Sequence, residues 1–564
     1  MTTAMKKITI LFFCILALNA CQDVLDIKPP DRITEEDVWK DVNAVRLYTN
    51  ATYATAFPQG LYRNTQIGHA TDEMHSIKGS VNYSRITRGE LTPDNVTDLN
   101  GNVMNNWKQA YATIRNVNVF MEKMATSLIE EKAKATMTAE MRFIRAHQYA
   151  QLIWRYGGVP LITDVFALDG DFARARNTYD ECVTFIVSEL DAVIGSGLLP
   201  DKQPAATLGL ASADAARAVK SRVLLYAASK LNNPGKDLAR WQAASDAAKA
   251  LIDGGRYSLN GDYRTTFTAH NNEVIFARYF TQAAAASTDA ASALPMELHF
   301  QVGRNGDSGW GSDTPTQNHV DAYEMSNGLS ITAPGSGYDA TNPYNNRDPR
   351  FYATVLFDGA VWKGRATETF ISGATGVVGG TDTNQGPIDV LNATQSGYYS
   401  KKFLQEEVPS QQGSTVRATS PYIMFRYAEI LLNYAEAQAM LGNDGEARTY
   451  ANLVRKRTGV DMPDITESGE QLLVRLQNER RVELAFEGHR YFDVRRWMIA
   501  ADTESKDILG ITIKKMANGT KTYEPRLLID RPTWNDKWLL LPIPRAEVDR
   551  SLKTLKQNEG YSVD

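Results

Sequence analysis

The chain has 564 residues, of which 43% are apolar and 23% charged, the proportions of an ordinary folded protein. Its formal net charge of −5 leaves no basic field for phosphate, which argues against nucleic-acid binding. Only Cys182 of the three cysteines lies beyond the N-terminal 21 residues, so we expect no intrachain disulfide in the mature protein.

The first 20 residues have the pattern of a secretory signal. Lys6 and Lys7 precede a mostly apolar run that is shorter than the roughly 20 residues of a membrane-spanning helix. The run ends in Leu-Asn-Ala-Cys at residues 18–21, which resembles a bacterial lipobox, whose cysteine receives a diacylglycerol. The alternative is a buried N-terminal helix with an ordinary cysteine, but its apolar face would lack a polar counterpart. We predict a signal peptide over residues 1–20 and lipidation of Cys21.

Residues 21–34 are predicted to be a lipid-anchored tether. Several acyl chains would anchor it durably without a membrane span, since each buried methylene contributes roughly 0.8 kcal/mol. Gln22, Asp23 and Asp26 resemble the acidic export signal that sends lipoproteins of the Bacteroidetes to the outer cell surface. We therefore expect a protein that is lipid-anchored to the outer membrane and faces the cell exterior.

The remaining chain divides into three parts that we expect to form one compact unit. Residues 35–260 are rich in predicted helices joined by short loops. Residues 261–420 are crowded with Gly, Asn, Ser and Thr, which predicts a loop-rich part. Residues 421–564 begin with helices and end in an extended apolar tail that contains Pro542 and Pro544.

Helix pairs recur in the first and last of these parts. In residues 422–441, Tyr427, Ile430 and Tyr434 lie on one helical stripe, and a second helix follows Gly442-Asn443. The pair spans a length close to the period of a tetratricopeptide repeat (TPR). Further pairs are expected at residues 106–124 with 139–158, 213–233 with 241–257, and within 470–497. They predict a mostly α protein whose TPR-like pairs form a curved scaffold, with a generic helical bundle as the alternative.

Charged and apolar residues alternate in residues 479–497, ERRVELAFEGHRYFDVRRW. Charges three and four positions apart can pair along a helix, while the aromatic residues pack. We interpret Glu479, Arg480, Glu483 and Glu487 as structural groups before functional ones.

The sequence has no recognisable catalytic motif. Its seven histidines form no HExxH pair, and CxxC, P-loop and GxSxG motifs are absent. HATDEMH, residues 69–75, comes nearest to a metal cluster but lacks the spacing of metal ligands on a helix. We therefore predict a protein that is not an enzyme and has no catalytic residue, cofactor or metal. The paired carboxylates of a glycoside hydrolase could be recognised only in space.

Tryptophan and tyrosine rings suit a sugar-binding surface, so tryptophans that helices do not explain are candidate ligand residues. Helical stretches or the apolar tail explain Trp39, Trp107, Trp154, Trp241, Trp497, Trp534 and Trp538. Trp310 and Trp362 remain, both in loops. Trp310 is the stronger candidate, because the glycines around it at 303, 306, 309 and 311 would let the chain present the ring outward. Its alternative role is to anchor the loop.

The order of several sequence blocks resembles the SusD/RagB family, the nutrient-binding lipoproteins of the Bacteroidetes. Besides the lipobox, the blocks are residues 38–53, 107–118, 142–163, 320–328, 346–355, 425–438, 479–497 and 539–550. The resemblance covers nearly the whole mature chain. It implies a SusD-like fold in which these blocks are scaffold and the loops between them carry the ligand surface.

The resemblance also adds ligand candidates and a partner. It places a ligand loop at residues 75–95, where Tyr83 and Arg85 are candidates because a guanidinium suits vicinal hydroxyls. Trp362 and Tyr399 are further candidates beside Trp310. The implied function is capture of an oligosaccharide without chemistry and its delivery to a SusC-like TonB-dependent outer-membrane transporter, with this protein as the lid.

Three alternatives remain open at this point. The same architecture could capture oligopeptides in a groove lined with backbone donors and acceptors. A surface glycoside hydrolase would need two carboxylates about 5–10 Å apart across a cleft. A plain TPR scaffold would bind another protein on its concave helical face.

Overall fold

The computed structural model describes residues 35–57, 67–76, 85–99, 106–166, 170, 173–281, 294–386, 393–410 and 418–562. The predicted signal peptide, Cys21 and the tether lie outside these residues. Within them, no helix combines the length and the apolar character that crossing a bilayer requires.

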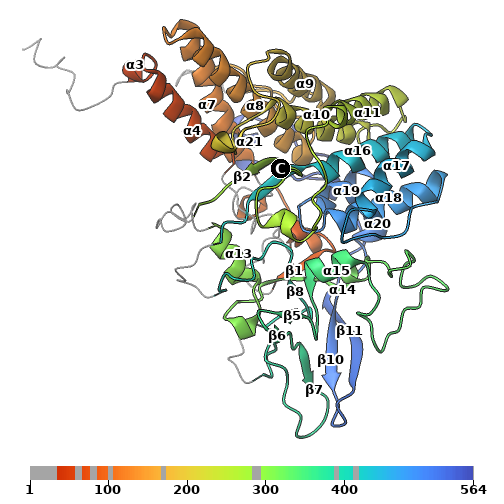
Figure 1. Cartoon of the computed structure of the whole chain (residues 1–564). Coiled ribbons are helices and arrows are strands. Elements are labelled where there is room, and N and C mark those ends of the chain that lie inside the picture. The colour runs from red at the N-terminus through yellow and green to blue at the C-terminus, as the bar shows by residue number, and fades with distance from the viewer. Residues whose placement is uncertain are drawn as a thin grey trace, which may run out of the picture.

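The helices gather in one layer of the molecule, at the top and right of Figure 1. The long ones are α4 (Val42–Ala56), α7 (Trp107–Thr126), α8 (Glu131–Tyr156), α9 (Tyr179–Gly195), α10 (Ala213–Ala228), α11 (Leu238–Asp253), α16 (Tyr427–Met440), α17 (Asp444–Arg455) and α18 (Gly469–Glu483). From α7 to α11 each helix packs on the next, and α11 then packs on α16 and α16 on α17. The predicted mostly α scaffold of helix pairs is confirmed, and it joins the first and last parts of the chain.

Two helix starts differ from the predicted pairs, and local capping explains both. Helix α8 begins at Glu131 instead of near residue 139, because the Glu130 carboxylate accepts hydrogen bonds from the backbone N–H groups of Lys132 and Ala133. Helix α9 was not predicted. It begins at a capping box in which Thr178 and Glu181 satisfy each other's backbone N–H groups.

The main hydrophobic core lies between these helices and includes the rings of Trp39, Trp107, Trp154 and Trp241, as predicted. The apolar tail reaches the same core through Leu541 and Ile543. The backbone N–H of Leu541 donates to the Arg155 carbonyl at 2.7 Å, so the tail lies across the end of α8. The apolar tail therefore packs across the helical layer.

The rest of the molecule consists of irregular segments, short helices and short strands. The short helices are α3 (Glu35–Val38), α13 (Leu294–Val302), α14 (Gln317–Val320), α15 (Pro349–Thr354), α19 (Arg490–Arg496), α20 (Ala500–Thr503) and α21 (Arg545–Arg550), and single 3₁₀ turns occur at Val96–Asp98, Ala205–Thr207, Thr265–Phe267, Asn305–Asp307 and Asp536–Leu539.

The strands are β1 (Met74–Ser76), β2 (Val274–Arg278), β3 (Asp313–Pro315), β4 (Val355–Leu356), β5 (Val361–Trp362), β6 (Arg365–Ala366), β7 (Phe370–Ser372), β8 (Tyr399–Ser400), β9 (Tyr422–Arg426), β10 (Ile508–Lys515) and β11 (Lys521–Ile529). They pair as β1–β3, β2–β9, β4–β8, β5–β6 and β11–β10–β7. The hairpin of β10 and β11, which the sequence analysis missed, projects away from the helices at the bottom of Figure 1.

The charged motif in residues 479–497 is structural. One of its pairs has the predicted spacing, because Arg496 binds Asp493 at 2.8 Å within α19, but Glu483 pairs with distant segments. The buried Glu483 carboxylate binds the guanidinium groups of Arg426 at 2.7 Å, Arg457 at 2.6 Å and Arg350 at 3.0 Å. These partners come from other segments of the chain instead of from the same helix. The motif therefore ties the loop-rich part to the last helices.

Candidate functional site

Trp310 lies in a loop, residues 303–312, that folds back on the end of α13. The N–H of Trp310 donates to the Phe300 carbonyl at 2.8 Å, and the N–H of Ser312 donates to the Gln301 carbonyl at 2.7 Å. The indole ring rests against the Phe300 ring, with 4.3 Å between their centres. The planes of the two rings are tilted by 51°, and both residues are partly exposed. The two rings together form an aromatic platform, which we call the Trp310 platform.

The glycines of this loop serve close packing more than outward presentation of the ring. A Cβ atom on Gly309 would lie 2.3 Å from backbone atoms of Gly303, and one on Gly306 would lie 2.2 Å from the Arg365 guanidinium. Among the four glycines, Gly311 has a positive φ, of +52°. The predicted reason for the glycines is therefore corrected: Gly309 lets the loop pack on itself, and Gly303 and Gly306 let it pack on neighbouring segments.

A buried arginine holds the loop from below. The Arg304 side chain is completely buried, and it donates to Asp307 at 2.8 Å and to the Trp362 carbonyl at 2.7 Å. Arg365 in turn binds both Asp307 and Asp382. Because a guanidinium offers donors in a rigid fork, these contacts fix the loop in one shape.

Strand pairing joins the first residues of the predicted loop 75–95 to the end of the Trp310 loop, whereas residues 85–95 pack against the C-terminal tail, where the Pro93 carbonyl accepts from the N–H of Arg545 at 3.0 Å. In the antiparallel β1–β3 ribbon Ser76 pairs with Asp313, so the chain that follows Ser76 and the chain that precedes Asp313 leave the ribbon at the same end. Tyr83 follows Ser76 but lies outside the described residues. Arg85 is partly exposed, and its guanidinium binds Asp98 at 2.7 Å.

Trp362 and Tyr399 occupy a different environment from Trp310. Their side chains are 1% and 0% exposed and belong to a hydrophobic core cluster beneath the loops. The Tyr399 hydroxyl donates to the Asp382 carbonyl at 2.8 Å. Neither ring presents a face to solvent, because a core cluster surrounds both of them. Their placement fits support of the Trp310 loop, and it corrects the expectation of exposed ligand-facing rings.

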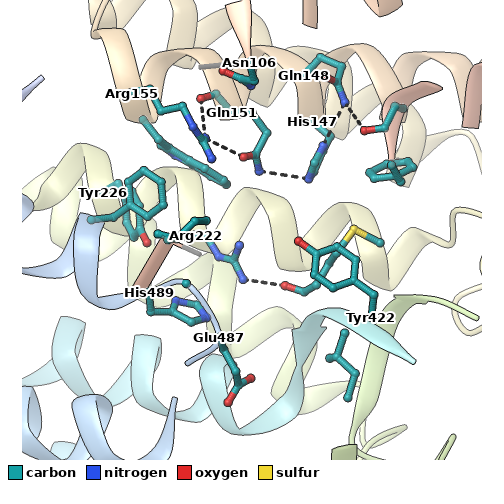
Figure 2. A pocket seen from close by; sticks show the side chains of 18 of the residues that line it. Asn106, His147, Gln148, Gln151, Arg155, Arg222, Tyr226, Tyr422, Glu487 and His489 are labelled. Atoms are coloured by element: carbon teal, nitrogen blue, oxygen red, sulfur yellow. Dashed lines mark hydrogen bonds between the residues drawn. The ribbon is translucent and has the colours of Figure 1, made fainter. Parts of the chain in front are cut away.

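A polar cavity of about 90 Å³ lies inside the molecule, where α8, α10, β9 and the chain before α19 meet. In Figure 2, His147, Gln151 and Arg155 line it on one side and Arg222 and His489 on the other. Gln151 contacts the His147 ring at 3.3 Å and accepts from Arg155 at 2.8 Å. Burial lowers the pKa of His147 to about 3, so this ring is neutral at physiological pH.

The chemistry of this cavity is limited. Glu487 is the one carboxylate among its described lining residues, and it is ion-paired with Arg426 and Lys402. Burial alone would raise the pKa of Glu487, but the two cations outweigh burial and lower it. The cavity has room for several water molecules. It therefore lacks both the space for a sugar chain and the carboxylate pair of a glycoside hydrolase.

The HATDEMH segment forms structural contacts. Asp72 binds Arg490 at 2.9 Å and Arg481 at 2.8 Å, and His69 lies 3.2 Å from Asp313. Burial, and then the charge of Asp72, raises the pKa of Glu73 to about 8. Among the described residues, no three His, Cys, Asp or Glu side chains are placed to hold a metal ion.

Phe300 is the residue of the candidate site that the sequence analysis missed. Its signal was an aromatic residue three positions before the first glycine of the loop. Only the fold-back of the loop, which depends on backbone hydrogen bonds, places it under Trp310.

Comparison with known proteins supports this architecture. The family model described as "SusD family" matches residues 272–561, which is just over half of the chain. A second model, described as "Starch-binding associating with outer membrane", matches residues 23–225.

Individual relatives match over almost their whole length. SusD-like protein P2 of Formosa agariphila is 24% identical over 99% of this chain and 100% of its own. A SusD-like protein of Bacteroides fragilis has a solved structure with a TM-score of 0.76 and 28% identity, and the match covers 95% of this chain and 100% of that one.

A second solved structure from Bacteroides fragilis is described as a SusD-like carbohydrate binding protein. It has a TM-score of 0.74 and 23% identity, over 91% of this chain and 99% of that one. Its likeness concerns the fold. The match of the family model to more than half of the chain shows that this protein belongs to the SusD family.

Proposed function

We propose that this protein captures an oligosaccharide at the Trp310 platform. The observation that carries the proposal is a partly exposed pair of aromatic rings, Trp310 on Phe300, on a loop that Arg304 holds in one shape. Flat rings bind the C–H faces of sugars at little cost in side-chain entropy. The descriptions of the family model as starch-binding and of a structural relative as carbohydrate binding support this ligand class.

The capture needs no reaction. Trp310 would stack on a sugar ring, and Tyr83, in the chain that follows β1, would donate a hydrogen bond to a sugar hydroxyl, with Arg85 as a second donor further along the same loop. A loop that is already fixed before binding loses little freedom when the ligand arrives, which favours affinity. The ion-paired single carboxylate of the interior cavity supports binding over hydrolysis.

The cellular arrangement that we propose follows from the leader and the family. Residues 1–20 would be removed, Cys21 would carry lipid, and residues 21–34 would tether one compact unit, residues 35–564, outside the outer membrane. A SusC-like TonB-dependent transporter would be the partner, with this protein as a lid that delivers the ligand. Deleting the transporter should abolish uptake of the captured saccharide, and unaltered uptake would contradict the role as a lid.

A binding array tests the ligand class. The purified mature protein should bind a subset of glycans in a mixed glycan and peptide array, and Trp310→Ala should lose that subset. Trp534→Ala is the matched control, because Trp534 is also partly exposed but packs against Trp538 near the C-terminal tail. Selective binding of peptides would favour the oligopeptide alternative, and release of reducing sugar from a bound glycan would show a hydrolase.

A further inference from the structure

A groove of about 430 Å³ lies in the helical part of the molecule, with no lining residue in the Trp310 loop. Its walls are α7, residues 160–166, and the chain from α21 to Leu555. In Figure 1, α7 and α21 lie in the upper, helical part, whereas α13, which precedes the Trp310 loop, lies lower. The groove is several times larger than the polar cavity and has the volume of a ligand site.

The floor of the groove is aromatic. Trp107 and Tyr111 pack with 5.1 Å between their ring centres, and Phe166 joins them from the opposite wall. Tyr111 is partly exposed, and its hydroxyl donates to the Pro160 carbonyl at 2.8 Å, so its ring is held in place. A fixed, partly open aromatic ring offers a stacking surface for a flat ligand face.

The opposite wall is equally fixed. The buried Asn118 donates from its amide to the carbonyls of Ile162, at 3.0 Å, and Asp164, at 3.2 Å. Arg145 donates to the oxygen of the same amide at 2.9 Å, which sets the orientation of Asn118. The groove is therefore preformed, and a ligand would not have to order it.

Positive charges outnumber negative ones at the rim of the groove. Arg174 lies 3.9 Å from Asp164, and Arg550 lies 2.7 Å from Glu547, so each of these carboxylates has a cation of its own. Lys108 and Arg115 are exposed and make no ion pair within the ranges that the structure describes. The groove thus carries an excess of two positive charges, although the whole chain has a net charge of −5.

The distance between Lys108 and Arg115 restricts the spacing of the negative charges on a ligand. Lys108, Tyr111 and Arg115 lie at steps of three and four along α7, so they share one face of the helix. Seven residues of helix separate the two charges by about 10 Å along the axis. This length matches two linked sugar rings, with the Tyr111 ring between the charges.

We propose that this groove is a second binding site, for an anionic oligosaccharide that carries a carboxylate or a sulfate on every second ring. The proposal takes its ligand class from the proposed function but does not depend on Trp310. An acidic peptide is the weaker fit, because its flexible charged side chains would leave the fixed, partly exposed Tyr111 ring without a rigid partner.

Titration calorimetry with defined tetrasaccharides tests the proposal. A hyaluronan tetrasaccharide carries carboxylates on alternate rings, a κ-carrageenan tetrasaccharide carries sulfates on alternate rings, and neoagarotetraose is neutral. The full mature protein should bind at least one anionic probe and bind it more tightly than the neutral one, and added salt should weaken this binding. The double variant Lys108→Ala/Arg115→Ala should lose about tenfold in affinity, since each exposed charge contributes modestly.

Controls separate this site from the Trp310 platform. Lys132→Ala removes an exposed lysine near the start of α8 and should leave the affinity for the anionic probe unchanged, as should Trp310→Ala. If the double variant binds like the wild type, if neither anionic probe binds, or if tetraglutamate binds more tightly than both, the proposal is wrong. If Trp310→Ala does not weaken the binding of neutral glycans, the proposed function is contradicted, but the proposal for the groove is not.

Discussion

The helical layer and the loop-rich part of this molecule are held together by different means. In the helices the backbone groups bond within each helix, and small or apolar side chains such as those of Ala215, Ala216 and Val219 on α10 fill the space between neighbours. In the loop-rich part many backbone carbonyls have no strand or helix partner. There, buried and partly buried cationic side chains donate to them.

Arg347 and Arg264 show how this works. Arg347 is buried and donates to the carbonyls of Pro343, Val320 and Tyr323 at 2.7–2.9 Å. Arg264 donates to the carbonyls of Lys401 and Leu404 at 3.0 and 2.7 Å. One guanidinium has five donors in a planar fork, so it satisfies several irregular carbonyls at once. A segment rich in Gly, Ser and Asn can therefore be rigid enough to present a binding surface.

The largest expected effect comes from the ion pairs that join the two parts. Glu483→Gln removes the charge that Arg350, Arg426 and Arg457 share, and we expect the free energy of unfolding to fall by about 3–5 kcal/mol because three buried cations each lose one of their carboxylate partners. Chemical denaturation followed by circular dichroism measures this change. Glu470→Gln, at an exposed position on the same helix, should change stability by less than about 0.5 kcal/mol.

The contribution of the same ion pairs to the free energy of unfolding should fall in acid. The arginines lower the pKa of Glu483 despite its burial, which alone would raise it. Its contribution to stability is therefore complete above the pKa of an unfolded glutamate and is lost as the pH falls below that value. The stability difference between the wild type and Glu483→Gln should shrink in acid, and a difference that stays constant would contradict the charge-based explanation.

Disrupting the close packing of the Trp310 loop is expected to lower the stability by an intermediate amount. Gly309→Ala forces a Cβ atom against the backbone of Gly303, so we expect a loss of about 1–3 kcal/mol in thermal unfolding together with weaker glycan binding. Gly445→Ala is the control, because Gly445 is helical in α17 with no atom near its would-be Cβ. That substitution should be neutral or stabilising by up to about 1 kcal/mol. Equal effects of the two substitutions would rule out the packing role.

The smallest expected effect concerns Glu73, which makes the free energy of unfolding depend on pH. This carboxyl has a pKa of about 8 in the folded protein, so it keeps its proton while an unfolded glutamate loses it. Between the unfolded pKa and about pH 8, Glu73 therefore lowers stability as the pH rises.

Glu73→Gln should remove this loss, so its free energy of unfolding relative to the wild type should rise from pH 5 to pH 6 by about 1 kcal/mol, since one pH unit between the two pKa values is worth roughly 1.4 kcal/mol. Thermal unfolding at the two pH values measures this change. Glu90→Gln, at an exposed position, should show no such trend. A difference that is the same at both pH values would contradict a buried, protonated Glu73.

Sequence reasoning succeeded where local patterns decide the structure. Apolar spacing predicted α7, α10, α11 and α16, and it placed Trp107 and Trp241 in the core. The capping box at Thr178 would have revealed α9, and the turn at Asn518-Gly519 between alternating residues would have revealed the β10–β11 hairpin.

Contacts between distant segments could not be predicted in this way. The burial of Trp362 and Tyr399 depends on strands and loops that come together only in the fold, and their local sequence is as polar as that around Trp310. The partners of Glu483 likewise lie up to 133 residues away along the chain. For the same reason the groove beside Tyr111, which joins α7 to the C-terminal segment, left no local signal.

Fluorine NMR of the 5-fluorotryptophan-labelled protein tests the central claim most directly, with Trp310→Phe used to assign the Trp310 signal among the nine tryptophans. On addition of the neutral oligosaccharide that binds best in the array, we predict that the Trp310 signal shifts with the ligand concentration while the buried Trp107, Trp241 and Trp362 signals stay in place. A Trp310 signal that does not move when the protein is saturated with the glycan would contradict the account.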